Sequence, residues 1–236
     1  MKKLGLILAG SLVLAACGDP AAPTLDNETK KASYAIGYRT GEQMQGLMQD
    51  MDLEAFLAGM RHGTQGDDGK AMLTEEELDN AIQEYQEQQR AAAEAKVKEE
   101  SEGNAAAGDK FREENGAKEG VTTTESGLQY EVMVSGEDGA AQPSIDDTVV
   151  VHYHGTLPDG TVFDSSVERG TPANFPLKGI IKGWQEALTM MKVGDKWRIV
   201  LPPDLAYGDR GAGAVIGPNQ TLVFEVELLG IEGDAE

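Results

Sequence analysis

The sequence of 236 residues is short of the residues that carry most thiol and metal chemistry, with one cysteine and three histidines. A lone thiol has no partner for a disulfide within the chain. His152 and His154 would share one face of a strand, because strand side chains alternate between faces. Two histidines without a third ligand do not make a metal site. We therefore expect no metal and no cofactor.

Basic residues are also scarce, since 20 lysines and arginines stand against 41 aspartates and glutamates and give a net charge of −21. A chain this acidic repels the phosphates of a nucleic acid. It also stays away from anionic membrane surfaces unless a segment anchors it. The charge thus excludes nucleic acid as a partner, although it says little about the fold.

The one long apolar run lies at the N-terminus, where Lys2 and Lys3 precede residues 4–14. This stretch has the length of a signal-peptide core and is too short to cross a bilayer as a helix. It ends in Leu14-Ala15-Ala16-Cys17, which resembles the lipobox of bacterial lipoproteins.

The lipobox resemblance implies that residues 1–16 are a signal peptide and that Cys17 becomes the acylated first residue. Acyl chains of this kind hold a protein at a membrane surface. An ordinary secretory signal that ends near a cysteine is the alternative. In bacterial lipoproteins, an aspartate directly after the cysteine would resemble a signal for retention in the inner membrane. Gly18 at that position therefore favours the outer membrane, whereas Asp19, one position later, leaves the inner membrane open. We expect a periplasm-facing lipoprotein of the outer membrane.

A flexible tether at residues 17–27 leads into a helical domain at residues 28–73. Apolar residues recur at helical spacing over residues 28–46, and Asp52 is placed to cap a second helix. About 50 residues of this kind make a poor core on their own, and methionines suit a surface that adapts to a partner. We expect a homodimer through this domain, with a small monomeric core as the alternative.

A capping box of the form Thr-x-x-Glu begins a third helix at Thr74. Little in the sequence breaks this helix, so residues 74–119 are expected to form a long connecting helix or linker. No apolar stripe continues beyond Gln86, which indicates a helix that runs through solvent between domains. A disordered acidic linker is the alternative, and Gly103 and Gly108 are the weakest points of the helix.

The remaining segment, residues 120–236, has the texture of a separate domain with strands. Apolar and polar residues alternate in four stretches, and glycine- and proline-rich turns lie between them. One short helical stretch, residues 184–191, interrupts the strands. The pattern predicts an α+β fold, a mostly antiparallel sheet with one short helix on it. The four stretches are residues 128–132, 148–153, 196–201 and 221–229.

Five motifs of this domain are similar to those of the FKBP-type peptidyl-prolyl cis/trans isomerases, in that family's order and spacing. The helical domain and the long helix ahead of them resemble the layout of the Mip and FkpA group of bacterial envelope isomerases, in which the N-terminal helices form a dimer. The five motifs are Val150-Val151-His152-Tyr153-His154-Gly155, Gly160-Thr161-Val162-Phe163-Asp164-Ser165-Ser166, Ile180-Ile181-Lys182-Gly183-Trp184, Leu205-Ala206-Tyr207-Gly208 and residues 221–228.

The resemblance implies a twisted sheet wrapped on the short helix, with a prolyl pocket between them. Trp184 would form the pocket floor, and the Tyr207 hydroxyl and the Ile181 N–H would bind substrate carbonyls. Asp164 would lie at the edge with Arg169 as its partner. The implied catalytic residues are Tyr153, Phe163, Asp164, Trp184, Tyr207 and Phe224, and the implied substrate-binding residues are Phe175, Ile180, Ile181, Val215 and Ile216.

Two positions depart from the single-domain prototype of the family. Ala173 stands where that protein has a wall aromatic, and Ala212 stands where it has a histidine in a loop over the pocket. Both departures are expected to open the rim. They bear on substrate preference and on the binding of macrolide inhibitors more than on activity itself.

The function that the resemblance implies is isomerisation of X-Pro bonds in unfolded or nascent polypeptides of the envelope. One alternative is a dimeric, chaperone-like clamp in which isomerisation is secondary, and another is a surface virulence factor. Without the resemblance, the aromatic residues on the strands would be read as ordinary sheet core.

Overall fold

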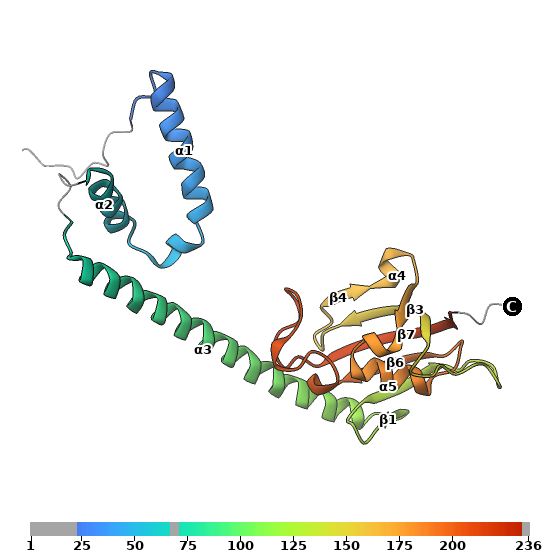
Figure 1. Ribbon diagram of the computed structural model, residues 1–236. Coiled ribbons are helices and arrows are strands. Elements are labelled where there is room, and N and C mark those ends of the chain that lie inside the picture. The colour runs from blue at the N-terminus through green and yellow to red at the C-terminus, as the bar shows by residue number, and fades with distance from the viewer. Residues whose placement is uncertain (1–22, 67–70, 233–236) are drawn as a thin grey trace, which may run out of the picture. The chain divides into compact units, whose positions relative to one another are not determined.

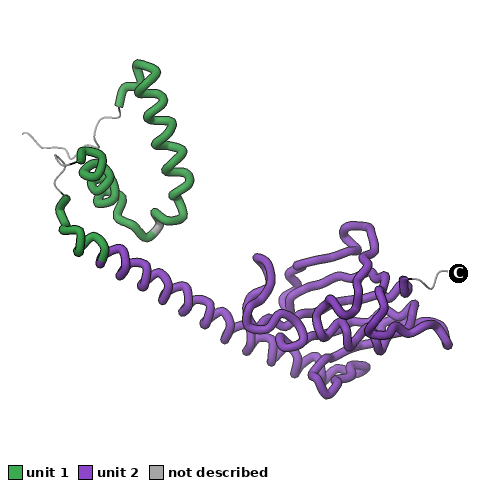
Figure 2. Tube along the Cα trace, viewed as in Figure 1, with its two compact units in different colours: residues 1–79 green, residues 80–236 purple. Residues whose placement is uncertain are grey.

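A computed structural model describes residues 23–66 and 71–232. The chain divides into two compact units, Met1–Asp79 and Asn80–Glu236 (Figure 2). The predicted signal peptide, Cys17 and the first part of the tether lie outside the described residues.

The first unit contains the helices α1 (Glu28–Met44) and α2 (Leu53–Thr64), with the 3-10 helix η1 (Leu47–Asp50) between them. Asn27 caps α1 by accepting a hydrogen bond from the Lys30 N–H. Asp52 caps α2 in the same way from the Ala55 N–H at 2.8 Å, as predicted. No residue of α1 or α2 is buried, so these two helices have no core of their own.

The long helix α3 (Glu75–Gly116) has 42 residues and continues through Gly103 and Gly108 without a break. Its length is therefore on the order of 60 Å. The predicted capping box is present, because the Thr74 N–H donates to the Glu77 carboxylate at 2.8 Å and the Glu77 N–H donates to the Thr74 hydroxyl at 3.3 Å. In the structure this segment is a continuous helix and not the disordered linker that was the alternative.

The last turns of α3 correct the expectation of a helix that runs through solvent. From residue 101 on, one face of the helix is covered by the rest of the second unit, and Gly108 and Asn115 are buried. The Asn115 side chain donates to the Gln129 side chain at 2.9 Å and accepts from Arg198 at 3.1 Å. The covered face is made of small and polar residues as well as one aromatic: Ser101, Asn104, Ala105, Gly108, Phe111, Arg112 and Asn115.

The second unit is built on one antiparallel sheet, in the order β1-β2-β6-β7-β3-β4 with β5 paired to β3 (Figure 1). Its strands are β1 (Val121–Thr123), β2 (Gln129–Val134), β3 (Thr148–Thr156), β4 (Val162–Ser165), β5 (Ala173–Pro176), β6 (Lys196–Leu201) and β7 (Leu222–Ile231). The other elements are the helices α4 (Ser166–Arg169) and α5 (Lys182–Met190) and the 3-10 helices η3 (Leu177–Gly179), η4 (Pro203–Leu205) and η5 (Gly208–Arg210).

The core lies between α5 and the inner face of the sheet. Along β3 the buried and half-buried residues alternate strictly, as a strand with one covered face requires. The helix buries Trp184, Ala187 and Leu188 against this face. The helix also approaches β6 very closely at Gly183, where an added Cβ would lie 2.5 Å from Leu201 Cδ2. The α+β prediction is confirmed.

The outer face of β3 carries the two histidines that share a strand face. The ring of His152 is hydrogen-bonded to the Ser166 hydroxyl at 3.1 Å, and that of His154 to the Ser165 hydroxyl at 3.0 Å. Within residues 23–66 and 71–232, no group of three or more metal-binding side chains is arranged around one point.

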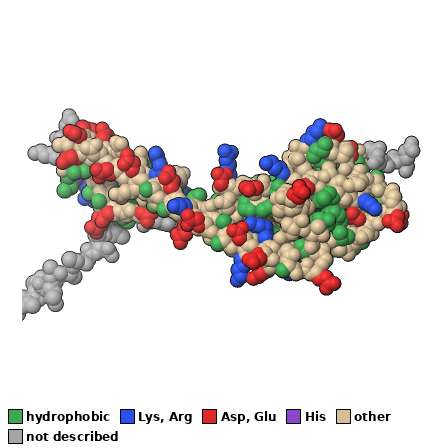
Figure 3. Space-filling model, turned by 90° about the horizontal axis from the view of Figure 1, so that it is seen from below, with side chains coloured by type: hydrophobic (Ala, Val, Ile, Leu, Met, Phe, Trp, Pro, Cys, Tyr) green, Lys and Arg blue, Asp and Glu red, His purple; other side chains and the backbone are tan. Residues whose placement is uncertain are grey.

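Acidic side chains are scattered over the face of each unit that is visible in Figure 3. They form no single anionic patch on that face. Across the described part of the chain, no helix combines the length and the apolar composition that a membrane span requires.

The two glycines in α3 give a matched test of this packing. No atom outside the helix lies within 4 Å of a Cβ added at Gly103, whereas a Cβ at Gly108 would overlap the Thr221 hydroxyl. Gly103→Ala should stabilise the protein by about 0.5–1 kcal/mol through helix propensity. Gly108→Ala should destabilise it by about 1–3 kcal/mol through overpacking. Urea unfolding followed by circular dichroism measures both, and a stabilising Gly108→Ala would contradict the packing described here.

Candidate functional site

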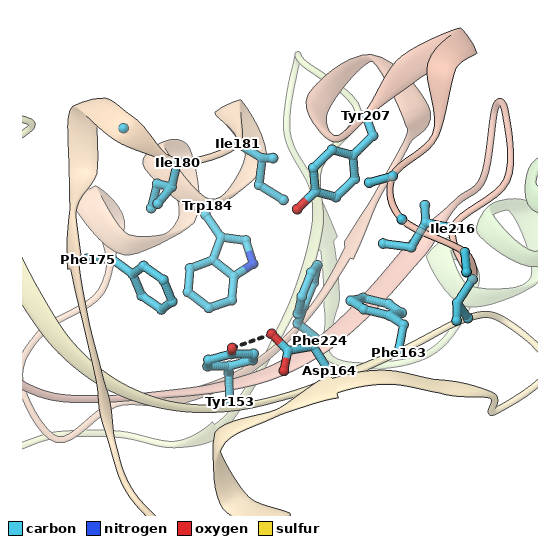
Figure 4. A pocket seen from close by; sticks show the side chains of 15 residues that line it. Tyr153, Phe163, Asp164, Phe175, Ile180, Ile181, Trp184, Tyr207, Ile216 and Phe224 are labelled. Carbon is cyan, nitrogen blue, oxygen red and sulfur yellow. Dashed lines mark hydrogen bonds between the residues drawn. The ribbon is translucent and has the colours of Figure 1, made fainter. Parts of the chain in front are cut away.

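A cavity of about 670 Å³ opens between α5, the inner face of the sheet and the loop before β7. Figure 4 shows its side chains. The structure brings together all eleven pocket residues that the sequence analysis expects: Tyr153, Phe163, Asp164, Phe175, Ile180, Ile181, Trp184, Tyr207, Val215, Ile216 and Phe224.

Trp184 forms the floor of the cavity and packs edge to face with three other rings. Its centroid lies 5.3 Å from Tyr153 on β3, 5.5 Å from Phe175 on β5 and 5.2 Å from Phe224 on β7, with interplanar angles of 79–86°. This edge-to-face arrangement is the one that aromatic quadrupoles favour. The indole N–H has no hydrogen-bond partner among the described residues, so it is an unused donor at the floor.

Phe163 and Phe224 continue the wall, with centroids 5.3 Å apart and an angle of 86°. They can approach β3 closely because the residue there is Gly155. A Cβ on Gly155 would lie 2.7 Å from the Phe163 ring and 3.0 Å from the Phe224 ring. The sequence analysis includes Gly155 in a motif but gives it no role. Its role is to leave room for two rings of the wall.

Two polar side chains, Tyr153 and Asp164, line one edge of the cavity, and Arg169 is bonded to both. The Tyr153 hydroxyl donates to the Asp164 carboxylate at 2.5 Å, which Figure 4 marks with a dashed line. Arg169 at the end of α4 forms an ion pair with Asp164 and donates to the Tyr153 oxygen at 2.8 Å. Its guanidinium carbon also lies 5.5 Å from the centre of the Tyr153 ring. The partnership of Asp164 and Arg169 is thus present in the structure.

These contacts fix the charges at the edge. Partial burial raises the pKa of Asp164, but hydrogen bonds from Tyr153 and Arg169 and the positive charge of Arg169 outweigh it and hold the pKa below its ordinary value. Burial, together with the hydrogen bond to Asp164, raises the pKa of the Tyr153 hydroxyl. At neutral pH the edge therefore carries a carboxylate, a guanidinium and a neutral phenol.

The opposite side of the cavity presents hydrogen-bond donors. Ile181 is the N-cap residue of α5, and its carbonyl accepts from the N–H groups of Trp184 and Gln185. Among the described residues, no acceptor is paired with the Ile181 N–H. The Tyr207 hydroxyl points into the cavity in Figure 4, and the side chain is 42% exposed.

The last wall belongs to residues 211–219, which we call the flap loop. It contributes Val215 and Ile216 as expected, together with Ala212, Gly213 and Ala214; Gly179 also lines the cavity. Glycine and alanine have no functional group that would mark them in the sequence as binding residues. Only their position in the fold shows that they line the cavity. Ala173 does not line the cavity but packs against the core.

The chemistry available at the cavity is narrow. The fifteen lining residues include one carboxylate and no serine, threonine, cysteine, lysine or histidine. Such a cavity offers an apolar group a dry aromatic environment and offers adjacent carbonyl oxygens two donors. It contains no serine, cysteine or lysine nucleophile, and its one carboxylate is held in the ion pair with Arg169.

Two family models match the chain. The model described as FKBP-type peptidyl-prolyl cis-trans isomerase covers residues 139–229, and the model described as the domain amino terminal to such isomerases covers residues 29–132.

Relatives match over nearly the whole length of the chain. The FKBP-type 22 kDa peptidyl-prolyl cis-trans isomerase of Escherichia coli is 47% identical over 210 residues, which are 89% of this chain and 98% of the relative. The peptidyl-prolyl cis-trans isomerase Mip of Coxiella burnetii is 41% identical over 98% of this chain and 99% of its own. The crystal structure of FkpA from Escherichia coli matches with a TM-score of 0.72 and 36% identity, covering 88% of this chain and 98% of that one.

Proposed function

The chain belongs to the FKBP-type peptidyl-prolyl cis-trans isomerases, and we propose that the aromatic cavity is where it isomerises X-Pro bonds. It is a peptidyl-prolyl cis-trans isomerase that acts on proline-containing polypeptides and assists their folding. One observation supports the assignment of the cavity most: four aromatic rings surround the indole of Trp184, no serine, cysteine or lysine lines the cavity, and two hydrogen-bond donors face it.

Prolyl isomerisation needs no bond to be broken. The amide resists rotation by about 18–20 kcal/mol because its C–N bond has partial double-bond character, which separates charge between nitrogen and oxygen. Twisting the bond removes that charge separation. A cavity that excludes water therefore disfavours the planar amide relative to the twisted one. Binding that fits the twisted form better than either isomer lowers the barrier further.

We assign the residues as follows. The proline ring packs on Trp184 between the other rings of the wall. The Tyr207 hydroxyl and the Ile181 N–H donate to carbonyl oxygens on either side of the proline. The charged edge formed by Asp164 and its partners keeps Tyr153 in place and adds no net charge.

A pair of aspartate variants tests this assignment. Asp164→Leu should lower kcat/KM for a proline tetrapeptide in a protease-coupled assay by about tenfold or more, equal to about 1.4 kcal/mol of transition-state stabilisation. Asp159→Leu is the control. Asp159 accepts a hydrogen bond from the Thr161 N–H in the turn before β4 and does not line the cavity, so kcat/KM should stay within about twofold of the wild type.

Trp184→Ala should lower kcat/KM in the same assay, although it also removes a core side chain. Its folding has to be checked by circular dichroism. A folded Asp164→Leu protein with wild-type kcat/KM would contradict the assignment of the cavity.

We also propose that the first unit is a homodimerisation domain. Its helices bury no residue and expose apolar side chains, with Ile36 68% and Leu57 48% exposed. A small unit whose two helices bury no residue has little core to stabilise it, and a second copy supplies the missing burial. The exposed apolar side chains of α1, η1 and α2 are Tyr34, Ile36, Tyr38, Leu47, Leu53, Leu57 and Met60.

The dimer is tested by charge introduced on this surface. The double variant Ile36→Lys and Leu57→Lys should have half the mass of the wild type in light scattering, because two lysines would have to be buried in the interface. Activity on a tetrapeptide should remain within about twofold, since the cavity belongs to the second unit. Glu54→Lys, an exposed position at the start of α2, serves as the control and should leave the dimer intact. Equal masses for all three proteins would contradict the proposal.

We propose further that the chain is anchored at Cys17 on the periplasmic side of the bacterial outer membrane. The lipobox-like sequence supports this, and the relative from Legionella longbeachae, 37% identical over 98% of both chains, is named outer membrane protein MIP. Cys17→Ser should move the protein from the membrane fraction to the soluble fraction. Unchanged fractionation would contradict acylation.

A further inference from the structure

The end of α3 contacts the flap loop as well as the sheet. The Asn104 side chain donates to the Pro218 carbonyl at 2.9 Å, and the Asn219 side chain donates to the Ser101 hydroxyl at 2.7 Å. At Gly217 the loop backbone approaches α3 so closely that a Cβ would lie 2.8 Å from Asn104 Nδ2. Residues more than 110 positions apart in the sequence are thus joined at the base of a loop that forms a cavity wall.

The other contacts of this loop lie at its tip and at its base. Ala212 and Ile216 exchange two backbone hydrogen bonds of 2.8 and 3.2 Å, which close the tip upon itself. The Asn219 N–H donates to the Gly208 carbonyl at 2.8 Å and so joins the loop base to the residue after Tyr207. Three glycines in nine residues make the loop backbone easy to displace. Apart from the packing of Ile216 against the core, the position of the loop over the cavity depends on how its base is anchored.

The polar contacts of α3 fall into two groups along the helix. Ser101 and Asn104 contact the flap loop. Arg112 contacts β2, because its carbonyl accepts from the Gln129 side chain at 2.8 Å, and its guanidinium donates to the hydroxyl of Thr221, the residue before β7. Asn115 contacts the sheet through Gln129 and Arg198. The second group docks the helix, and the first group reaches the cavity wall.

We propose that Ser101 and Asn104 are positioning residues for isomerisation, which hold the flap loop over the cavity and so set the width of its mouth. The long helix is then part of the isomerase site and not only a connection to the first unit. This inference rests on the proposed function, because it assumes that the cavity binds the proline segment.

Two asparagines of the same helix provide the test. In the full-length protein, Asn104→Ala should raise KM for a proline tetrapeptide by about three- to tenfold, the effect of the one hydrogen bond that it loses. Its kcat should change less, because the aromatic floor is untouched. Asn115→Ala should lower the melting temperature and leave KM within about twofold. Ser101→Thr retains the hydroxyl and should stay close to the wild type, whereas Ser101→Ala should raise KM.

Amide hydrogen exchange gives a second readout that a docking role alone would not change. The N–H groups of Ala212 and Ile216 should exchange faster in Asn104→Ala than in Asn115→Ala or the wild type. Equal effects of the two asparagine variants on KM and on exchange at these amides would overturn the proposal, and so would no effect of either. The Asp164→Leu variant distinguishes failure of the positioning role from failure of the cavity assignment. If Asp164→Leu loses activity while Asn104→Ala keeps the wild-type KM, only the positioning role fails. If Asp164→Leu keeps its activity, the assignment of the cavity fails.

Discussion

The cavity depends on where one side chain, the indole of Trp184, is held. Three rings from three different strands pack edge to face with it, and each such pair contributes about 0.5–1.5 kcal/mol beyond the area it buries. The helix that carries Trp184 packs directly on Leu201 at Gly183, where a larger residue would displace the Leu201 side chain or the helix. The strand pairing of β3, β5 and β7 therefore determines the cavity floor, and a change in register would remove it.

The polar edge of the cavity follows from this arrangement. Tyr153 contributes its ring to the packing of Trp184 and its hydroxyl to Asp164, so one side chain serves both the floor and the edge. Burial alone would favour a neutral Asp164, but its bonds to Tyr153 and Arg169 keep the carboxylate charged. Carboxylate and guanidinium cancel, which leaves an apolar cavity beside an edge of no net charge. That is a suitable environment for a neutral amide whose polarity falls as it twists.

The sequence predicts those parts of the molecule that follow from local patterns. Asp52 and Thr74 begin helices because their side chains cap them, and the long strands β3, β6 and β7 appear as alternation. The short strands β1, β4 and β5 have three or four residues each and show no pattern of that kind.

The contact between the end of α3 and the rest of the second unit was not predictable from hydropathy, because its central residues are Ser101, Asn104 and Gly108 in place of an apolar stripe. The pocket residues were found through the resemblance to a family and not through periodicity, which would have assigned the same rings to the core. Gly155 and Gly183 became meaningful only when the structure showed what lies next to them. Close approach of this kind is a property of the fold, so it has no signature in a single sequence.

The central claim is that the proline ring lies on the aromatic floor while its amide bond rotates. Nuclear Overhauser effects between the wild-type protein and a short peptide with one X-Pro bond test it directly. The account predicts cis–trans exchange peaks for the peptide, together with contacts from the proline ring protons to the Trp184 indole and the Phe224 ring. Catalysed exchange with proline contacts to residues outside the cavity, and none to these two rings, would contradict it.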